Sequence, residues 1–145
     1  MAAGFAANIV TGDNYVVVSM VGELDLAEGP TLRNTLERAI SAGTRLVVAD
    51  ATDLMFLDSS GIGILVAAHK AQSATGGTFV VANLNVSVGK PVRLTEVDTA
   101  VPVHWAEPPA TPWSDDGATA ESIVLALGFD ESARPLLRAE AKSRS

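Results

Sequence analysis

An apolar run between two segments of helical periodicity constrains the fold of this chain more than any other feature. Residues 46–49, Leu-Val-Val-Ala, form a continuous apolar run of the kind that marks a strand buried on both faces. The apolar spacing on either side predicts helices over Pro30–Ser41 and about Ser60–Ala74. Strands that alternate with helices in this way indicate βαβ units and a largely parallel sheet.

Each of the two predicted helices has an apolar face. In the first helix, residues at four-residue spacing form this face, namely Leu32, Leu36 and Ile40. The charged residues of the same segment are expected to face water: Arg33, Glu37 and Arg38. In the second helix one stripe is formed by Ile62, Leu65, Val66 and His69. These faces predict that the two helices pack on the sheet.

Further segments extend the alternation in both directions. Residues 8–21 read as an antiparallel hairpin around the turn-forming residues Thr11–Asn14. Two more core strands are predicted at Thr78–Ala82 and Val101–Trp105, with a short helix around Pro91–Val97 between them. We therefore expect one α/β domain with a mixed, mostly parallel sheet of four to five strands, an N-terminal antiparallel hairpin and about four helices.

The composition changes at Glu107. Residues 107–117 are rich in proline and read as an extended linker, and about Ala118–Leu127 as a last helix. We expect the domain to span residues 8–128, and residues 129–145, which are charged and rich in small side chains, to form a mobile tail.

The composition also argues against several classes of function. The chain of 145 residues has a formal net charge of −7, which disfavours a grip on nucleic acid or an anionic membrane. It contains no cysteine, so thiolate nucleophiles and cysteine-based zinc sites are absent. No signal sequence is recognised, and no apolar stretch approaches the roughly 20 residues of a membrane helix. We expect a soluble cytoplasmic protein.

Residues 56–63, FLDSSGIG, place one carboxylate and two hydroxyls at the start of the second long helix. The carboxyl edge of parallel strands favours ligand sites, and a helix start has unpaired backbone N–H groups. In the simplest interpretation Asp58 and the two serines are helix caps, and Asp58 adds a favourable charge there. The two glycines of the stretch would then let the helix pack closely on the sheet.

A second motif, Gly22-Glu23-Leu24-Asp25, lies at the end of another predicted strand. Together with residues 53–63, DLMFLDSSGIG, it resembles the STAS domain of bacterial anti-sigma factor antagonists. The pattern of that family combines G-E-L-D with D-x-x-x-(apolar)-D-S-[ST]-G-(apolar)-G at this separation. The resemblance covers about residues 8–128. The chain departs from the family at Thr95–Asp98, where a more apolar helix is usual, in its proline-rich linker and in its longer tail.

The resemblance implies a binding protein switched by phosphorylation, and not an enzyme. In the family, the serine after the motif aspartate, here Ser59, is phosphorylated by an anti-sigma factor that is also an ATP-dependent serine kinase. The unmodified antagonist holds that factor and frees a sigma factor, and the phosphorylated form lets go until a phosphatase restores the serine. By this resemblance the partner-binding residues are Asp25, Asp58, Ser59, Ser60 and Gly61. No cofactor or metal is expected, and the chain would be a monomer or a weak dimer.

Catalytic alternatives have little support in the sequence. A serine hydrolase would need a histidine near Ser59, but no Gly-x-Ser-x-Gly motif is present and His69 lies ten residues further along the same predicted helix. Nothing in the sequence points His104 at that serine. Gly61-x-Gly63 is only a fragment of a nucleotide-binding motif, and two scattered histidines give no metal-ligand spacing.

A non-catalytic alternative stays open within the same resemblance. A STAS domain can serve as a scaffold or sensory module that is not tied to a sigma factor. Trp105 and Trp113, with the prolines between them, would then form a docking surface, although the simpler interpretation is that they cover the edge of the core. Such a scaffold should form large homo-oligomers without a kinase.

Overall fold

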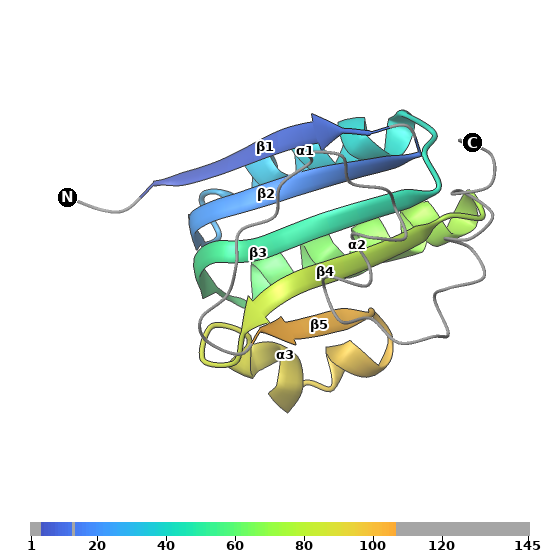
Figure 1. The fold of residues 1–145 in the computed structure, drawn as a ribbon. Coiled ribbons are helices and arrows are strands. Elements are labelled where there is room, and N and C mark those ends of the chain that lie inside the picture. Colours follow the sequence, from blue (N-terminus) through green and yellow to red (C-terminus); the bar gives the residue numbers. More distant parts are fainter. Residues whose placement is uncertain (1–3, 13, 107–145) are drawn as a thin grey trace.

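The computed structural model describes residues 4–12 and 14–106, which form a five-stranded sheet with helices packed on it (Figure 1). The strands follow one another across the sheet in chain order, β1 to β5. β1 pairs antiparallel with β2, and the remaining pairs are parallel. The predicted α/β class, with its N-terminal hairpin and mostly parallel sheet, is therefore confirmed.

Within the part of the chain that the structure describes, three helices were predicted. That part contains three α-helices and one short 3-10 helix. The predicted linker, the helix at about 118–127 and the tail at 129–145 lie outside the described residues.

The hairpin consists of β1, Phe5–Thr11, and β2, Tyr15–Leu24. Its register runs from the Phe5–Gly22 pair to the Thr11–Val16 pair, so the predicted turn lies between the two strands. β2 is longer than expected, because the hairpin was predicted to end at residue 21 and the strand continues to Leu24. Leu24 is completely buried and pairs with Leu57 of the next strand, which keeps this end of β2 in the sheet.

The central strand β3 spans Leu46–Leu57 and is also longer than predicted. The apolar run at its start is buried on both faces of the sheet, as expected. The strand continues past this run because the polar side chains that follow are paired. The Asp50 carboxylate accepts hydrogen bonds from the Thr52 backbone N–H (3.0 Å) and hydroxyl (2.6 Å), and the amide of Asn83 donates to the Thr52 hydroxyl (3.1 Å).

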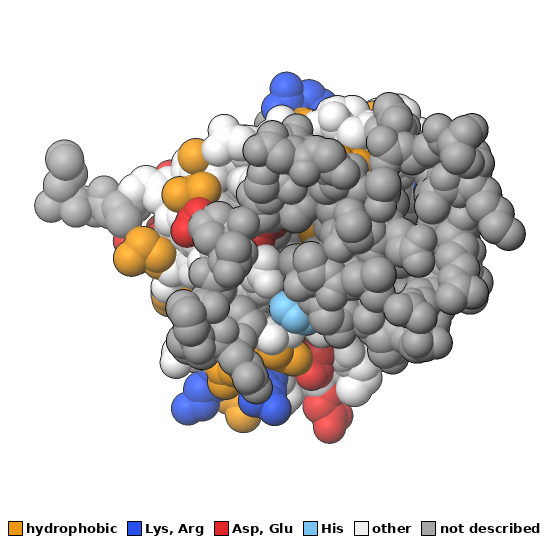
Figure 2. All heavy atoms as spheres, viewed as in Figure 1, with side chains coloured by type: hydrophobic (Ala, Val, Ile, Leu, Met, Phe, Trp, Pro, Cys, Tyr) orange, Lys and Arg blue, Asp and Glu red, His pale blue; other side chains and the backbone are white. Residues whose placement is uncertain are grey.

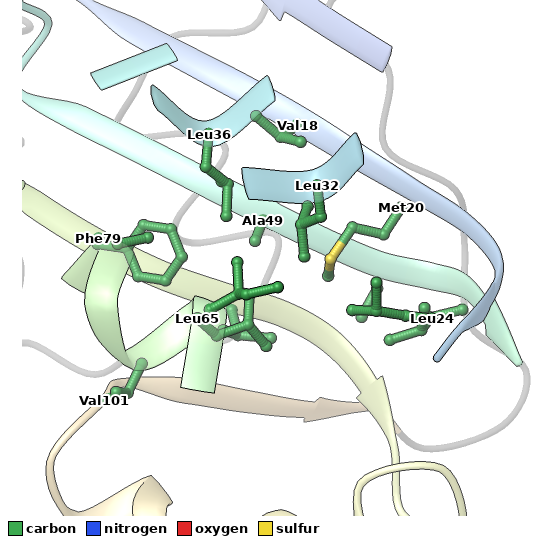
Figure 3. Close-up of a cluster of buried hydrophobic side chains, with 14 of the residues drawn as sticks. Val18, Met20, Leu24, Leu32, Leu36, Ala49, Leu65, Phe79 and Val101 are labelled. Carbon is green, nitrogen blue, oxygen red and sulfur yellow. The ribbon is translucent and has the colours of Figure 1, made fainter. Parts of the chain in front are cut away.

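The two long helices, α1 (Gly29–Ser41) and α2 (Ser59–Ala74), lie side by side on one face of the sheet, behind it in the view of Figure 1. In Figure 3, Leu32 and Leu36 of α1 and Leu65 of α2 point toward the sheet, where Val18 and Ala49 lie. All five side chains are buried, so the apolar faces predicted for the helices do form the core.

Both long helices begin at the same edge of the sheet, where β2 and β3 end, because each follows a parallel strand. They also end alike, with a glycine in the left-handed region just past the last turn. Gly43 has φ +76° and Gly76 has φ +85°, a conformation that costs a glycine little.

The far edge of the sheet contains β4 (Thr78–Asn85) and β5 (Val103–Ala106), joined through α3 (Lys90–Leu94) and the 3-10 helix η1 (Val97–Thr99). The single short helix predicted here is thus two helices, because Glu96 between them has a left-handed φ of +57°. β5 begins two residues later than predicted. The Arg93 guanidinium lies 5.2 Å from the ring centroid of Trp105, so this tryptophan packs at the edge of the domain. Trp113 lies outside the described residues.

Candidate functional site

The strand register brings the two predicted motifs together. Leu24, the last residue of β2, pairs with Leu57, the last residue of β3. Asp25 and Asp58 each follow one of these paired residues, so they leave the sheet next to each other at its carboxyl edge. This edge is also where α1 and α2 begin. The structure therefore places the G-E-L-D aspartate beside the start of the helix that carries the two serines.

Asp58, one of the three residues predicted as caps, is the N-cap of α2. Its backbone is extended (φ −109°, ψ −177°), as an N-cap requires. Its Oδ1 atom accepts hydrogen bonds from the backbone N–H groups of Ser60 (3.0 Å) and Gly61 (3.1 Å). The same oxygen accepts a hydrogen bond from the Ser60 hydroxyl (2.5 Å). One carboxylate oxygen therefore serves three donors.

These hydrogen bonds stabilise the ionised form of Asp58. The Ser60 hydroxyl is the main cause that lowers the pKa of this carboxyl below its usual value. Partial burial acts in the opposite direction, and the N–H groups of Gly61 and Ser60 add to the lowering. Asp58 is therefore a fixed negative charge directly next to Ser59.

The two serines have different environments. Ser60 is half-buried and its hydroxyl is held by Asp58. Ser59 is the first residue of α2 and is exposed. No hydrogen bond joins the Ser59 hydroxyl to any other residue within the described ranges. Of the two hydroxyls, that of Ser59 is the one that a reagent or enzyme in solution can approach.

The two glycines also differ, although both were expected to permit close packing. A Cβ atom on Gly61 would lie 2.8 Å from side-chain carbons of Leu24 and Leu57, so this glycine does let α2 approach the strand ends. A Cβ atom on Gly63 would have nothing within 4 Å, and the residue is exposed. The expectation was correct for Gly61 and wrong for Gly63, whose position is not dictated by packing.

Asp25 is exposed and has a local structural role. Its Oδ1 atom accepts the backbone N–H of Glu28 at 3.1 Å, and its backbone carbonyl accepts the same N–H at 3.1 Å. This pair of contacts shapes the turn that leads from β2 into α1. The second carboxylate oxygen has no hydrogen-bond partner among the described residues, and Asp25 is exposed at the edge that also holds Asp58.

Three exposed apolar residues that the sequence analysis did not single out lie close in the chain to Asp25 and Asp58. Leu26 is 76% exposed, Met55 is 69% exposed and Phe56 is 44% exposed. We call these three residues the edge patch. Leu26 follows Asp25 in the chain. Met55 and Phe56 lie near the end of β3, three and two residues before Asp58. Figure 2 shows hydrophobic and acidic side chains together on the left, over the carboxyl ends of the parallel strands.

A bulge explains why two consecutive strand residues point outward. Gly22 pairs with Leu54 and Glu23 pairs with Phe56, so Met55 is an extra residue on β3. A β-bulge interrupts the alternation of side chains and turns the strand end. An alternating pattern read from the sequence would bury one of the two residues, and so only the pairing of the strands reveals the edge patch.

The histidines are not placed to activate a serine or hold a metal. His104 lies in β5, its Nδ1 atom accepts the backbone N–H of Asn83 at 3.3 Å, and burial lowers its pKa. His69 is half-buried in the later part of α2, more than two turns past Ser59. Within the described ranges, no group of three or more potential ligands could hold a metal ion. No helix in the same ranges is long and apolar enough to cross a membrane.

The fold and this edge define a domain class, and comparison with known proteins identifies it. The family model described as "STAS domain" matches residues 6–107. The chain therefore belongs to the STAS domain family.

The names of similar proteins in this family agree on one function. The anti-sigma-B factor antagonist of Bacillus subtilis (strain 168) is 28% identical over 78 residues, which cover 54% of this chain and 71% of the relative. The anti-sigma F factor antagonist of Paenibacillus polymyxa is 26% identical over 90 residues, which cover 61% of this chain and 77% of the relative. The chain is thus similar, at low identity, to antagonists of anti-sigma factors.

Solved structures agree on the fold. An anti-sigma factor antagonist from Mycobacterium paratuberculosis has a TM-score of 0.65 at 25% identity, with 80% of this chain and 94% of that chain covered. The anti-sigma factor antagonist SpoIIAA in its unphosphorylated form has a TM-score of 0.62 at 20% identity, with 87% of this chain and all of that chain covered (100%).

Proposed function

We propose that this protein is an anti-sigma factor antagonist whose unmodified form binds an anti-sigma factor that is also a serine kinase. Binding keeps the kinase from its sigma factor. Phosphorylation of Ser59 by the bound kinase weakens the complex, and a phosphatase returns the protein to its binding form. The ATP and magnesium belong to the kinase, so the chain itself acts as a substrate and a regulator and not as an enzyme.

The exposed, unengaged hydroxyl of Ser59 is the observation that carries this proposal. Ser60, its neighbour, is tied to Asp58 and is a poorer acceptor for a phosphoryl group. The names of relatives supply the class of partner, since they are called antagonists of anti-sigma factors. One structural neighbour, SpoIIAA, is described in a phosphorylated form, which shows that a protein of this fold can carry the modification.

The edge patch supports a protein partner at the same place. Exposed apolar side chains gathered at one edge are typical of interaction sites. Leu26 directly follows Asp25 and Met55 lies three residues before Asp58, so a partner that covers them would lie close to Ser59. Such an interface would have an apolar centre with acidic groups beside it, and its complement would be an apolar surface with basic groups.

The charges of the site explain how a phosphoryl group would cause release. It adds about −1.5 to −2 charges at neutral pH. Asp58 is already a fixed negative charge next to Ser59, and Asp25 faces the same edge. A tightly packed partner would have to desolvate all of these charges together. A penalty of about 3 kcal/mol reduces affinity by roughly two orders of magnitude, and so release needs no refolding.

The direct test is labelling of the full chain by the anti-sigma factor of its own host, with ATP and magnesium. We expect one phosphate on the wild-type protein, one on Ser60→Ala and none on Ser59→Ala. Ser60→Ala is the matched control because it removes the neighbouring hydroxyl and leaves the proposed acceptor. Label on Ser59→Ala would refute the site. Large homo-oligomers that bind no anti-sigma factor would favour the scaffold alternative, which no described feature of Trp105 supports.

A further inference from the structure

A groove of about 460 Å³ runs between α1 and α2 and opens beside Ser59. Arg33 and Glu37 line it from α1, and Ser59, Ser60 and Gly63 line it from α2. The two helices start at the same edge of the sheet and run in the same direction, with the backbone of Gly29 close to the Ile64 side chain. A cation on one helix and the candidate phosphorylation site on the other therefore face a common space.

The glycine one turn after Ser59 leaves room on this side of the groove. Ser59 and Gly63 are four residues apart in α2, so they lie on the same face of the helix, one turn from each other. Gly63 has no side chain, and even an added Cβ would meet nothing within 4 Å. The side chain of Arg33 starts one turn into α1 and is expected to lean back toward the start of its helix, and Arg33 and Ser59 line the same groove.

The Arg33 guanidinium has no polar partner within the part of the chain that the structure describes. It is exposed, and neither a hydrogen bond nor an ion pair joins it to another residue of the described ranges. Glu37 lies one turn further along α1 and also lines the groove. Their order, arginine before glutamate at four-residue spacing, is the weaker orientation for a pair within a helix. Arg33 is thus available for an anion that arrives in the groove.

We propose that Arg33 binds the phosphoryl group of phosphorylated Ser59 across this groove. The inference rests on the proposed function, because it assigns a ligand to the modification proposed there. A guanidinium offers two parallel N–H donors to phosphate oxygens, which makes arginine the preferred side chain for this contact. The contact joins α1 to α2 and holds the dianion away from Asp58. Arg33 is therefore a positioning residue for the phosphorylated state, with no role in the unmodified one.

The second ionisation of the phosphate reports this contact directly. A cation next to the phosphate favours the dianion and lowers its second pKa, so removal of the cation raises it. The probe is full-length protein with phosphoserine incorporated at position 59 during synthesis, titrated by ³¹P NMR. We expect Arg33→Gln to raise the phosphate pKa by about 0.5 to 1, in line with opposite charges at a solvent-exposed site. Glu37→Gln should lower the phosphate pKa, because it removes a nearby negative charge that disfavours the dianion.

Arg38→Gln is the matched control. Arg38 is also an exposed arginine of α1, but it lines a different hollow that does not include Ser59. We expect its titration curve to coincide with that of the unsubstituted phosphoprotein, and Arg33→Lys to restore part of the shift. Equal curves for Arg33→Gln and Arg38→Gln would overturn the proposal.

This experiment separates the inference from the function on which it rests. Phosphoserine is installed without a kinase, so the titration can show the Arg33 contact whether or not a kinase labels Ser59. A shift without kinase labelling would refute the proposed function and leave the phosphate site standing. Labelling of Ser59 by the kinase without a shift of the phosphate pKa would support the proposed function and refute the Arg33 contact. Unmodified Arg33→Gln should unfold at the same temperature as the wild type, because its side chain makes no described polar contact.

Discussion

Replacement of Asp58 with alanine should destabilise the domain, because a single carboxylate oxygen caps the start of α2. That oxygen accepts two backbone N–H groups, of Ser60 and Gly61, and one hydroxyl. Loss of an N-cap acceptor costs about 0.5 to 2 kcal/mol. The three donors at this half-buried position place our expectation in the upper half of that range, about 1 to 2 kcal/mol at neutral pH. Urea denaturation followed by circular dichroism measures it as a lower midpoint with an unchanged slope.

The effect should depend on pH with a definite sign. The pKa of Asp58 is lowered in the folded protein, so the folded chain holds this proton less tightly than the unfolded chain. The stability that comes from the charge is therefore fully present above the unfolded-state pKa, near about 4, and is lost as the pH falls through the lower folded-state pKa. The difference between wild type and Asp58→Ala should be constant near neutral pH and shrink in acid.

Asp53→Ala is the control for this prediction. Asp53 is an exposed carboxylate on β3, five residues earlier, and makes no hydrogen bond with its side chain in the described structure. Its replacement should change the free energy of unfolding by less than about 0.5 kcal/mol. If Asp58→Ala lost no more stability than Asp53→Ala, or if its deficit grew in acid, the reasoning about the cap would be refuted.

Three further substitutions test other parts of the site. Gly63→Ala should raise the free energy of unfolding by up to about 1 kcal/mol, since alanine favours a helix and the added carbon meets no neighbour; a loss of stability in urea would contradict this. Gly61→Ala should lower it by about 1 to 3 kcal/mol, because the added carbon would collide with Leu24 and Leu57; an unchanged midpoint would count against the packing described here. Met55→Glu should weaken binding of the anti-sigma factor and leave the unfolding temperature unchanged, because the side chain is 69% exposed; calorimetry that finds wild-type affinity would exclude the edge patch from the interface.

The main architecture could be predicted from the sequence because its strong signals are local. Apolar runs and four-residue spacing mark the strands and the two long helices, and each such helix begins within one residue of its predicted start. The ends of β2 and β3 could not be predicted in the same way. Asp50 and Thr52 lie beyond the predicted strand, and they stay in β3 because Asn83, about thirty residues later, provides part of their hydrogen bonding.

The site was only partly predictable for a similar reason. The adjacent residues Asp58, Ser59 and Ser60 can each cap a helix, so their order does not say which one does. The choice depends on the extended backbone of Asp58 and leaves one serine engaged and the other exposed. The outward direction of Met55 and Phe56 depends on the bulge between β2 and β3. Each of these features follows from strand pairing, which no local pattern encodes.

The central claim is that charge on Ser59 decides whether the partner stays bound. The most direct measurement is the affinity of the host's anti-sigma factor for two forms of the full chain, unmodified and with phosphoserine at position 59, by isothermal titration calorimetry at one salt concentration. We expect the phosphorylated form to bind more weakly by roughly two orders of magnitude, which corresponds to about 3 kcal/mol. Equal affinity of the two forms would contradict the account.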